Sequence, residues 1–175
     1  MTTRKIILTL LSSLLLLGCT GKPKLVEPVS AFELNRYLGT WYEIARLDHS
    51  FERGLNQITA EYSLNEDGSV KVVNRGWKEE EGQWSEALGK AKFVGDSKKG
   101  HLKVSFFGPF YGSYIIFHLE PDYSTALISG PNLDYFWILS RTPTLEDEEL
   151  ERLKKIASQV GFDTNSLLYP NHKSM

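Results

Sequence analysis

Eight segments between residues 40 and 141 alternate apolar and polar side chains or run apolar between turn residues. The clearest is 56–64, in which Ile58, Ala60, Tyr62 and Leu64 are separated by polar residues. A period of two is the pattern of a β-strand with one buried face. We therefore predict an all-β fold, an eight-stranded antiparallel up-and-down barrel. The predicted strands are 40–48, 56–64, 69–77, 86–94, 101–107, 113–119, 124–130 and 134–141.

The two ends of this region carry complementary residues. Gly39-Thr40-Trp41 opens the first predicted strand and Arg141 ends the last. Eight strands in a closed meander bring these two ends together. We expect Trp41 to plug one end of the barrel, with the Arg141 guanidinium stacked on its indole, a contact of about 0.5–2 kcal/mol.

The connections between the predicted strands alternate in kind, and every second connection of a meander lies at the same end. Compact turns rich in Asp, Gly and Pro should therefore share the Trp41 end. A short helical turn over 32–38, with Ser30 as its expected cap, should cover that end. The compact turns are 65–68, 96–100 and 120–122, and the longer or more aromatic connections, expected around the open mouth, are 48–55, 78–85, 108–112 and 131–133.

A helix is expected after the barrel. Residues 143–147 combine a proline, a cap at Thr144 and two acids in the first turn. A stripe of period near 3.6 follows, and Gly161 should end it in a left-handed conformation. We expect this helix to pack outside the barrel and 167–169 to form one more short edge strand. The stripe is Leu145, Leu150, Leu153, Ile156, Ala157 and Val160.

The first 18 residues are typical of a secretory signal, with Arg4 and Lys5 before a short apolar run. The run is too short to span a membrane, which takes about 20 residues. Leu16-Leu17-Gly18-Cys19 resembles a bacterial lipobox, which implies lipidation of Cys19; a plain cleavable signal is the alternative. Residues 19–31 have no periodicity and are interpreted as a flexible tether to a domain over 32–175.

Several function classes have no support in the sequence. The net charge of −2 becomes −4 without residues 1–18, and no basic run suggests nucleic acid. The single cysteine excludes an intrachain disulfide. The histidines at 49, 101, 118 and 172 lack metal-ligand spacing, and no nucleophile elbow, phosphate loop or dinucleotide motif occurs. We predict no enzyme activity, no metal and no cofactor.

Three motifs resemble the lipocalin family. Besides the Gly39-x-Trp41 and Arg141 signature, Pro121-Asp122-Tyr123 is similar to the family's middle motif. The stretches 106–112 and 134–143 resemble a bacterial outer-membrane lipoprotein branch that is similar to apolipoprotein D. The resemblance implies binding of fatty acids, phospholipids or lysophospholipids, for lipid storage or transport in envelope maintenance. With Thr20 after the lipobox, it also implies a lipid-anchored protein on the periplasmic side of the outer membrane.

Alternation and the lipocalin pattern together predict which side chains face inward. For strand 69–77 two sets are plausible, and we choose Val70, Val72 and Asn74 because this choice keeps Arg75 outside. Small residues, among them Ala91 and Ala126, should preserve a pocket for an apolar guest with a small polar group. The predicted ligand-binding residues are Ala45, Ala60, Tyr62, Asn74, Phe93, Val104, Phe106, Tyr114, Ile116, His118, Ile128, Tyr135 and Trp137.

Two other functions remain open. One is an envelope lipoprotein with a filled barrel whose mouth loops bind a protein, and the less favoured one is a lipid-modifying enzyme. The aromatic tip Phe110-Tyr111 suggests contact with a membrane or with a second copy in a homodimer, although a packed loop is the plainer interpretation. His118 is either a polar group of the pocket or a structural residue.

Overall fold

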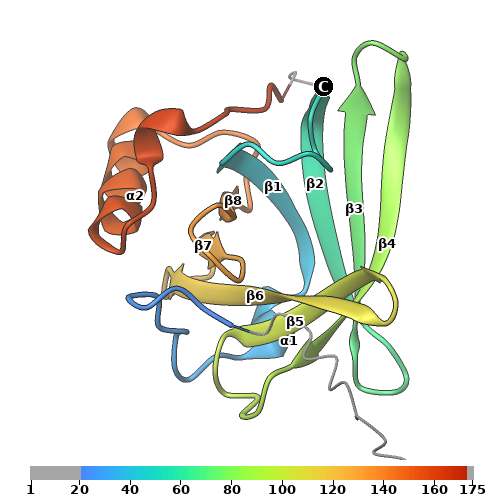
Figure 1. The fold of residues 1–175 in the computed structure, drawn as a ribbon, viewed down its shortest axis with the longest axis vertical. Coiled ribbons are helices and arrows are strands. Elements are labelled where there is room, and N and C mark those ends of the chain that lie inside the picture. Colours follow the sequence, from blue (N-terminus) through green and yellow to red (C-terminus); the bar gives the residue numbers. More distant parts are fainter. Residues whose placement is uncertain (1–20, 173–175) are drawn as a thin grey trace, which may run out of the picture.

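The computed structural model describes residues 21–172, and Figure 1 shows their arrangement. Eight antiparallel strands close into one barrel in the order β1 to β8, with β8 hydrogen-bonded to β1. The predicted fold is confirmed, and each predicted strand has its counterpart. The strands are β1 (Gly39–Arg46), β2 (Leu55–Leu64), β3 (Val70–Lys78), β4 (Gln83–Phe93), β5 (His101–Phe107), β6 (Phe110–Leu119), β7 (Thr125–Ser129) and β8 (Phe136–Ser140).

One end of the barrel is closed by the chain that leads into β1. The helix α1 (Leu34–Tyr37) lies at this end, near the turns after β2, β4 and β6. The Phe32 N–H donates to the Lys98 carbonyl at 2.9 Å, and the Glu33 N–H to the Tyr123 hydroxyl at 3.0 Å. The compact turns therefore lie at the predicted end. The expected Ser30 cap is wrong, because α1 begins after Glu33 and has no side-chain cap.

The opposite end is open, and two of its four connections are shorter than predicted. The predicted loop 78–85 shrinks to residues 79–82, and only Gly108 and Pro109 join β5 to β6. Trp77 and Trp84 pair across β3 and β4 with ring centroids 5.7 Å apart. Such cross-strand aromatic pairs stabilise a hairpin, which explains why the ladder extends into the expected loop.

A second hydrophobic core lies outside the barrel, under the helix α2 (Asp147–Gln159), which Figure 1 shows beside β1, β7 and β8. Leu153 and Ala157 are fully buried there against outward-facing strand residues such as Phe136. Gly161 has φ +105° and follows the helix end, as predicted. The Thr144 cap is wrong: α2 begins at Asp147, after Glu146, with three acids in its first turn. The predicted edge strand is a single bridge between Arg46 and Leu168.

Part of the segment expected to be a flexible tether packs against the barrel. Val26 is fully buried in the outer core. The Val29 N–H donates to the Ile116 carbonyl, and its own carbonyl accepts from the Gly100 N–H, both at 2.9 Å. These contacts fix residues 26–29 beside β6. The signal segment and Cys19 lie outside the described residues, in which no helix is long and apolar enough to cross a membrane.

Candidate ligand-binding site

A cavity of about 570 Å³ runs into the barrel from the open end. Leu34 and Tyr37 line its floor, and Phe51, Phe107 and Phe110 line its mouth. Most of the remaining lining is aliphatic or aromatic. Nine of the predicted binding residues line it: Ala60, Tyr62, Asn74, Val104, Phe106, Tyr114, Ile128, Tyr135 and Trp137.

The choice made for β3 is confirmed. Val70, Val72 and Asn74 all line the cavity. The Asn74 Oδ1 is buried and has no hydrogen-bond partner among the described residues. Arg75 also reaches the lining, but it is half-exposed and its Nε donates to Glu86 at 2.7 Å.

Two predicted residues face inward but lie below the cavity. Phe93 packs edge-on against Phe32 with centroids 6.1 Å apart, in the hydrophobic cluster inside the barrel. Ile116 is fully buried in the same cluster, close to Gly100. Both side chains form the plug beneath a guest and do not contact the cavity.

Two other predicted residues, Ala45 and His118, face outward, and the reason is the same for each. The register of β1 against β8 shifts between Glu43 and Ala45, and that of β6 against β7 shifts between Ile116 and His118. A β-bulge places one extra residue on one strand, so alternation reverses beyond it. Ala45 is therefore buried in the outer core. The His118 ring contacts Glu120 at 2.7 Å on the outer surface.

Three tyrosine hydroxyls meet at the lower end of the cavity. The Tyr114 hydroxyl lies 2.7 Å from that of Tyr37 and 2.8 Å from that of Tyr62. Burial raises the pKa of all three phenols, so each remains protonated at neutral pH. The tyrosines thus present a neutral, hydrogen-bonded floor to the apolar space above them.

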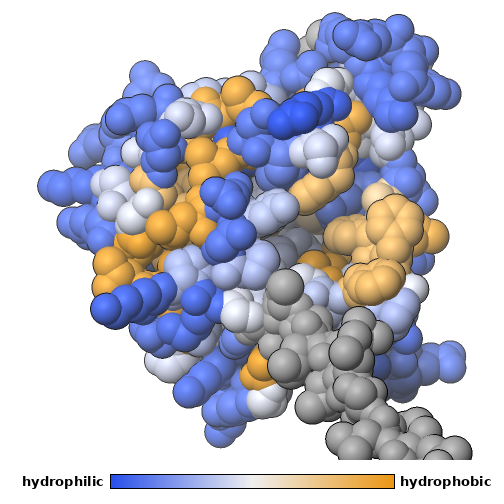
Figure 2. Space-filling model, in the orientation of Figure 1, coloured by the Kyte–Doolittle hydropathy of each residue, from blue (hydrophilic) through white to orange (hydrophobic). Residues whose placement is uncertain are grey.

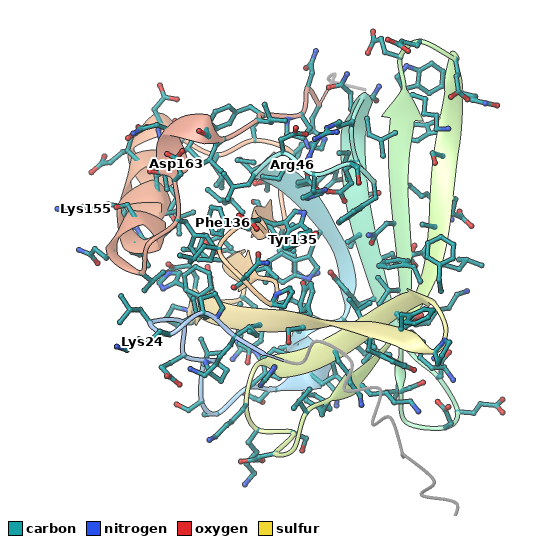
Figure 3. The ribbon with its side chains drawn as sticks, viewed as in Figure 1. Lys24, Arg46, Tyr135, Phe136, Lys155 and Asp163 are labelled. Atoms are coloured by element: carbon teal, nitrogen blue, oxygen red, sulfur yellow. The ribbon has the colours of Figure 1, made fainter. Side chains whose placement is uncertain are left out.

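The upper wall contains a buried polar cluster that the sequence analysis did not identify. Arg46, at the end of β1 (Figure 3), donates from Nη1 to Glu43 Oε1 at 2.8 Å and from Nη2 to the Glu52 carbonyl at 2.9 Å. The Trp137 indole N–H donates to Glu52 Oε2 at 3.1 Å. Glu43 and Glu52 both line the cavity and are at most 6% exposed. The sequence feature that could have predicted this cluster is an acid in the middle of a strand, Glu43, three residues before Arg46.

The two carboxyl groups share the charge of one arginine. Burial raises the pKa of Glu43 well above its usual value, and the Glu52 charge raises it further, while Arg46 lowers it. Burial also raises the pKa of Glu52, against the indole N–H of Trp137 and the charge of Arg46. The hydrogen bond between the two carboxyl groups raises the pKa of Glu43 and lowers that of Glu52, so Glu43 is the acid that holds a proton more firmly.

Aromatic rings surround this cluster at the mouth. His49 stacks on Phe51 with centroids 4.0 Å apart and lies 5.0 Å from the Trp137 ring. Tyr135 lies 6.3 Å from Trp137 and 6.4 Å from Phe51. Figure 3 shows Tyr135 and Phe136 on opposite sides of the chain, Phe136 toward α2. Gly130 makes room for Tyr135, since a Cβ there would lie 2.5 Å from the Tyr135 Cβ.

The chemistry available is that of a binding site. Within residues 21–172, no group of three or more His, Cys, Asp or Glu side chains could hold a metal ion. The barrel instead offers an enclosed apolar space, closed at one end, with polar groups at two depths. A fold and site of this kind define a protein that binds small apolar molecules.

Comparison with known proteins places this barrel in a family. Residues 32–172 match the family model for the lipocalin-like domain. The chain is 59% identical to the outer membrane lipoprotein Blc of Vibrio cholerae, over 93% of this chain and 96% of that protein. It is 47% identical to the Escherichia coli K12 protein of the same name, over 90% of each. The chain belongs to the lipocalin family, and its outer membrane lipoprotein relatives belong to a non-enzymatic group of binding proteins.

More distant relatives share the architecture. Apolipoprotein D of Mus musculus is 35% identical over 78% of this chain and 75% of that protein. Among solved structures, insecticyanin from Manduca sexta superimposes with a TM-score of 0.69 at 22% identity, covering 85% of each chain. The latter likeness concerns the fold alone.

Proposed function

We propose that this protein is an outer-membrane lipoprotein that carries a single-chain lipid, a fatty acid or a lysophospholipid, for storage or transport in the envelope. The observation that supports this most directly is the cavity of about 570 Å³, apolar along most of its lining and closed at the Trp41 end. An acyl tail entering through the mouth would replace contacts with water by contacts with Val104, Phe106 and Ile128. Each buried methylene contributes about 0.8 kcal/mol, which suits a guest held mainly by its tail.

Membrane attachment through Cys19 completes the proposal. The relatives at 59% and 47% identity are named outer membrane lipoproteins, and Cys19 stands in a lipobox-like sequence. Acyl chains on this cysteine would anchor the barrel on the periplasmic face. A Cys19→Ala variant should leave the membrane fraction after processing, whereas unchanged attachment would contradict the proposed anchor.

A lipid titration tests carriage. Trp137 lines the cavity, so its fluorescence should respond when fatty acids or lysophospholipids of increasing length are added. We expect a saturable response whose affinity rises with chain length until the cavity is full, and which is lost in Trp137→Ala. A flat response at every length, with no lipid in native mass spectra, would favour the alternative of a structural lipoprotein.

The exposed aromatic hairpin favours contact with a lipid surface or a second copy during exchange. Phe107 and Phe110 are 83% and 69% exposed and also line the mouth. Figure 2 shows apolar surface gathered where this hairpin between β5 and β6 lies beside β4. Phe110→Ser should slow lipid transfer from vesicles; an unchanged transfer rate would assign the loop no part in exchange.

A further inference from the structure

The upper wall of the cavity has an unusual charge balance for a fatty-acid carrier. Glu43 and Glu52 line it, and both carboxyl groups are almost completely buried. Of the described side chains that line the cavity, only Arg75 is cationic, and it is half-exposed and paired with Glu86. Arg46 donates from Nη1 to Glu43 and from Nη2 to the Glu52 carbonyl, and its Nε lies 3.9 Å from Glu52 Oε2, so its charge is already paired with the two acids. An anionic headgroup placed here would meet two acids and no free cation.

The aromatic rings near these two acids favour a positively charged headgroup. Phe51, Tyr135 and Trp137 line the cavity and lie within 6.4 Å of a neighbouring ring in this group. Aromatic faces attract a cation electrostatically, and groups of aromatic rings recognise quaternary ammonium ligands in this way. Glu52 is fixed beneath these rings by the Trp137 indole N–H.

We propose that Glu43, Glu52, Phe51, Tyr135 and Trp137 form a subsite for a positively charged ammonium headgroup on a single-chain lipid. This inference rests on the proposed lipid carriage and names the class of headgroup. The tail would run down toward the tyrosine floor. The ammonium group would lie against the rings, within reach of the two carboxyl groups.

Binding of a cation at this place is coupled to a proton. Glu43 is faced by Arg46 on its own strand, by Glu52 on the loop after β1 and by Tyr62 on β2, and His49 lies against Glu52 with its Nε2 3.0 Å from Glu52 Oε2. In the empty site the Arg46 charge balances one carboxylate, so the second acid keeps its proton. An ammonium ion supplies a second positive charge. Glu43 then releases its proton to solvent, and the site holds two carboxylates against two cations.

Amphiphiles of equal tail length isolate the headgroup. An alkyltrimethylammonium, an alkyl sulfate and a monoacylglycerol would be titrated below their critical micelle concentrations, between pH 5 and 8. Neither charged headgroup titrates in this range, so any pH dependence reports the protein. We expect the cation to bind about tenfold more tightly than the sulfate at pH 8. The affinity for the cation should rise with pH.

Variants assign the effect to residues. Glu43→Gln keeps the shape of the side chain but cannot ionise, so the preference for the cation should fall to about threefold or less, and its pH dependence should vanish. Phe51 is 60% exposed, so Phe51→Ala leaves the fold intact and should weaken cation binding selectively. Glu120→Gln and Tyr169→Ala, an acid and an aromatic residue outside the barrel, are the matched controls.

Each result has a defined meaning. Tetramethylammonium, which has no tail, should not bind at comparable concentrations, because the site is meant for a lipid headgroup and not for a free ion. Equal affinities for the cation and the sulfate, or an unchanged preference for the cation in Glu43→Gln and Phe51→Ala, would overturn the ammonium subsite. The proposed lipid carriage would still stand if affinity rose with the length of the lipid tail. Failure of all three amphiphiles to bind would overturn both proposals.

Discussion

The guanidinium carbon of Arg141 lies 3.9 Å from the centre of the Trp41 ring. The same group donates to the carbonyls of Thr40, Tyr37 and Leu38 at 2.8–3.1 Å. The Trp41 indole N–H donates to the Tyr37 carbonyl at 2.8 Å. The last strand is thereby fastened to the chain that enters the first, and both strands hold the floor of the cavity.

A double-mutant cycle should measure this coupling. Trp41→Ala removes a fully buried ring, and such truncations cost about 3–5 kcal/mol of unfolding free energy. Arg141→Ala should lower stability less in the Trp41→Ala background than in the wild type, because its stacking partner is gone. Denaturant unfolding of the four proteins gives the coupling. Additive losses within about 0.5 kcal/mol would show that the two side chains are energetically independent.

The tyrosine floor allows a second stability prediction. Tyr114 is hydrogen-bonded to both Tyr37 and Tyr62, so Tyr114→Phe removes two bonds and leaves two buried hydroxyls short of a partner. We expect a loss of about 1–3 kcal/mol in thermal or denaturant unfolding. Tyr111→Phe, in the neighbouring part of β6, is the control. A loss below about 0.5 kcal/mol would mean that the hydroxyls contribute no net stability.

Most of the barrel follows from period-two alternation and turn chemistry, which depend on neighbours in sequence. Ile58, Ala60 and Tyr62 show the pattern plainly, and the distant pair Trp41 and Arg141 needed only the additional rule that eight strands close. Alternation and the resemblance to the lipocalin pattern together placed nine of the thirteen predicted binding residues on the cavity wall.

The errors come from features that local pattern does not encode. Ala45 and His118 both follow bulges, and one extra residue in a strand reverses every later assignment. Phe93 and Ile116 face inward as predicted. They lie below the cavity because the residues that close this end of the barrel fill the space around them, and alternation does not predict how much of the barrel is filled. Glu52 lies in a loop, and only the folded chain brings it back to Trp137 and Arg46.

The two cores should be separable by mutation. Leu153 is fully buried under α2 in the outer core, so Leu153→Ala should cost about 2–5 kcal/mol of stability without changing lipid affinity. Leu139, which lines the cavity from β8, is the matched inner residue, and Leu139→Ala should change both properties. Unfolding and lipid titration of each variant provide the comparison. If Leu153→Ala remains folded but binds lipid with a changed affinity, the outer core and the cavity are not independent.

His49 gives the protein a defined pH dependence of stability. Burial, together with the Arg46 charge, lowers its pKa from 6.5 to about 4. The unfolded chain binds a proton near pH 6.5 and the folded protein only near pH 4, so stability conferred by the neutral ring is present above pH 6.5 and declines as the pH falls. Relative to His49→Gln, the wild type should lose about 1–2 kcal/mol between pH 7 and pH 5, measured by denaturant unfolding at each pH. Glu43 has a raised pKa and acts in the opposite direction, and it is present in both proteins. Parallel pH profiles for the two proteins would show that His49 is protonated as easily in the folded barrel as in the unfolded chain.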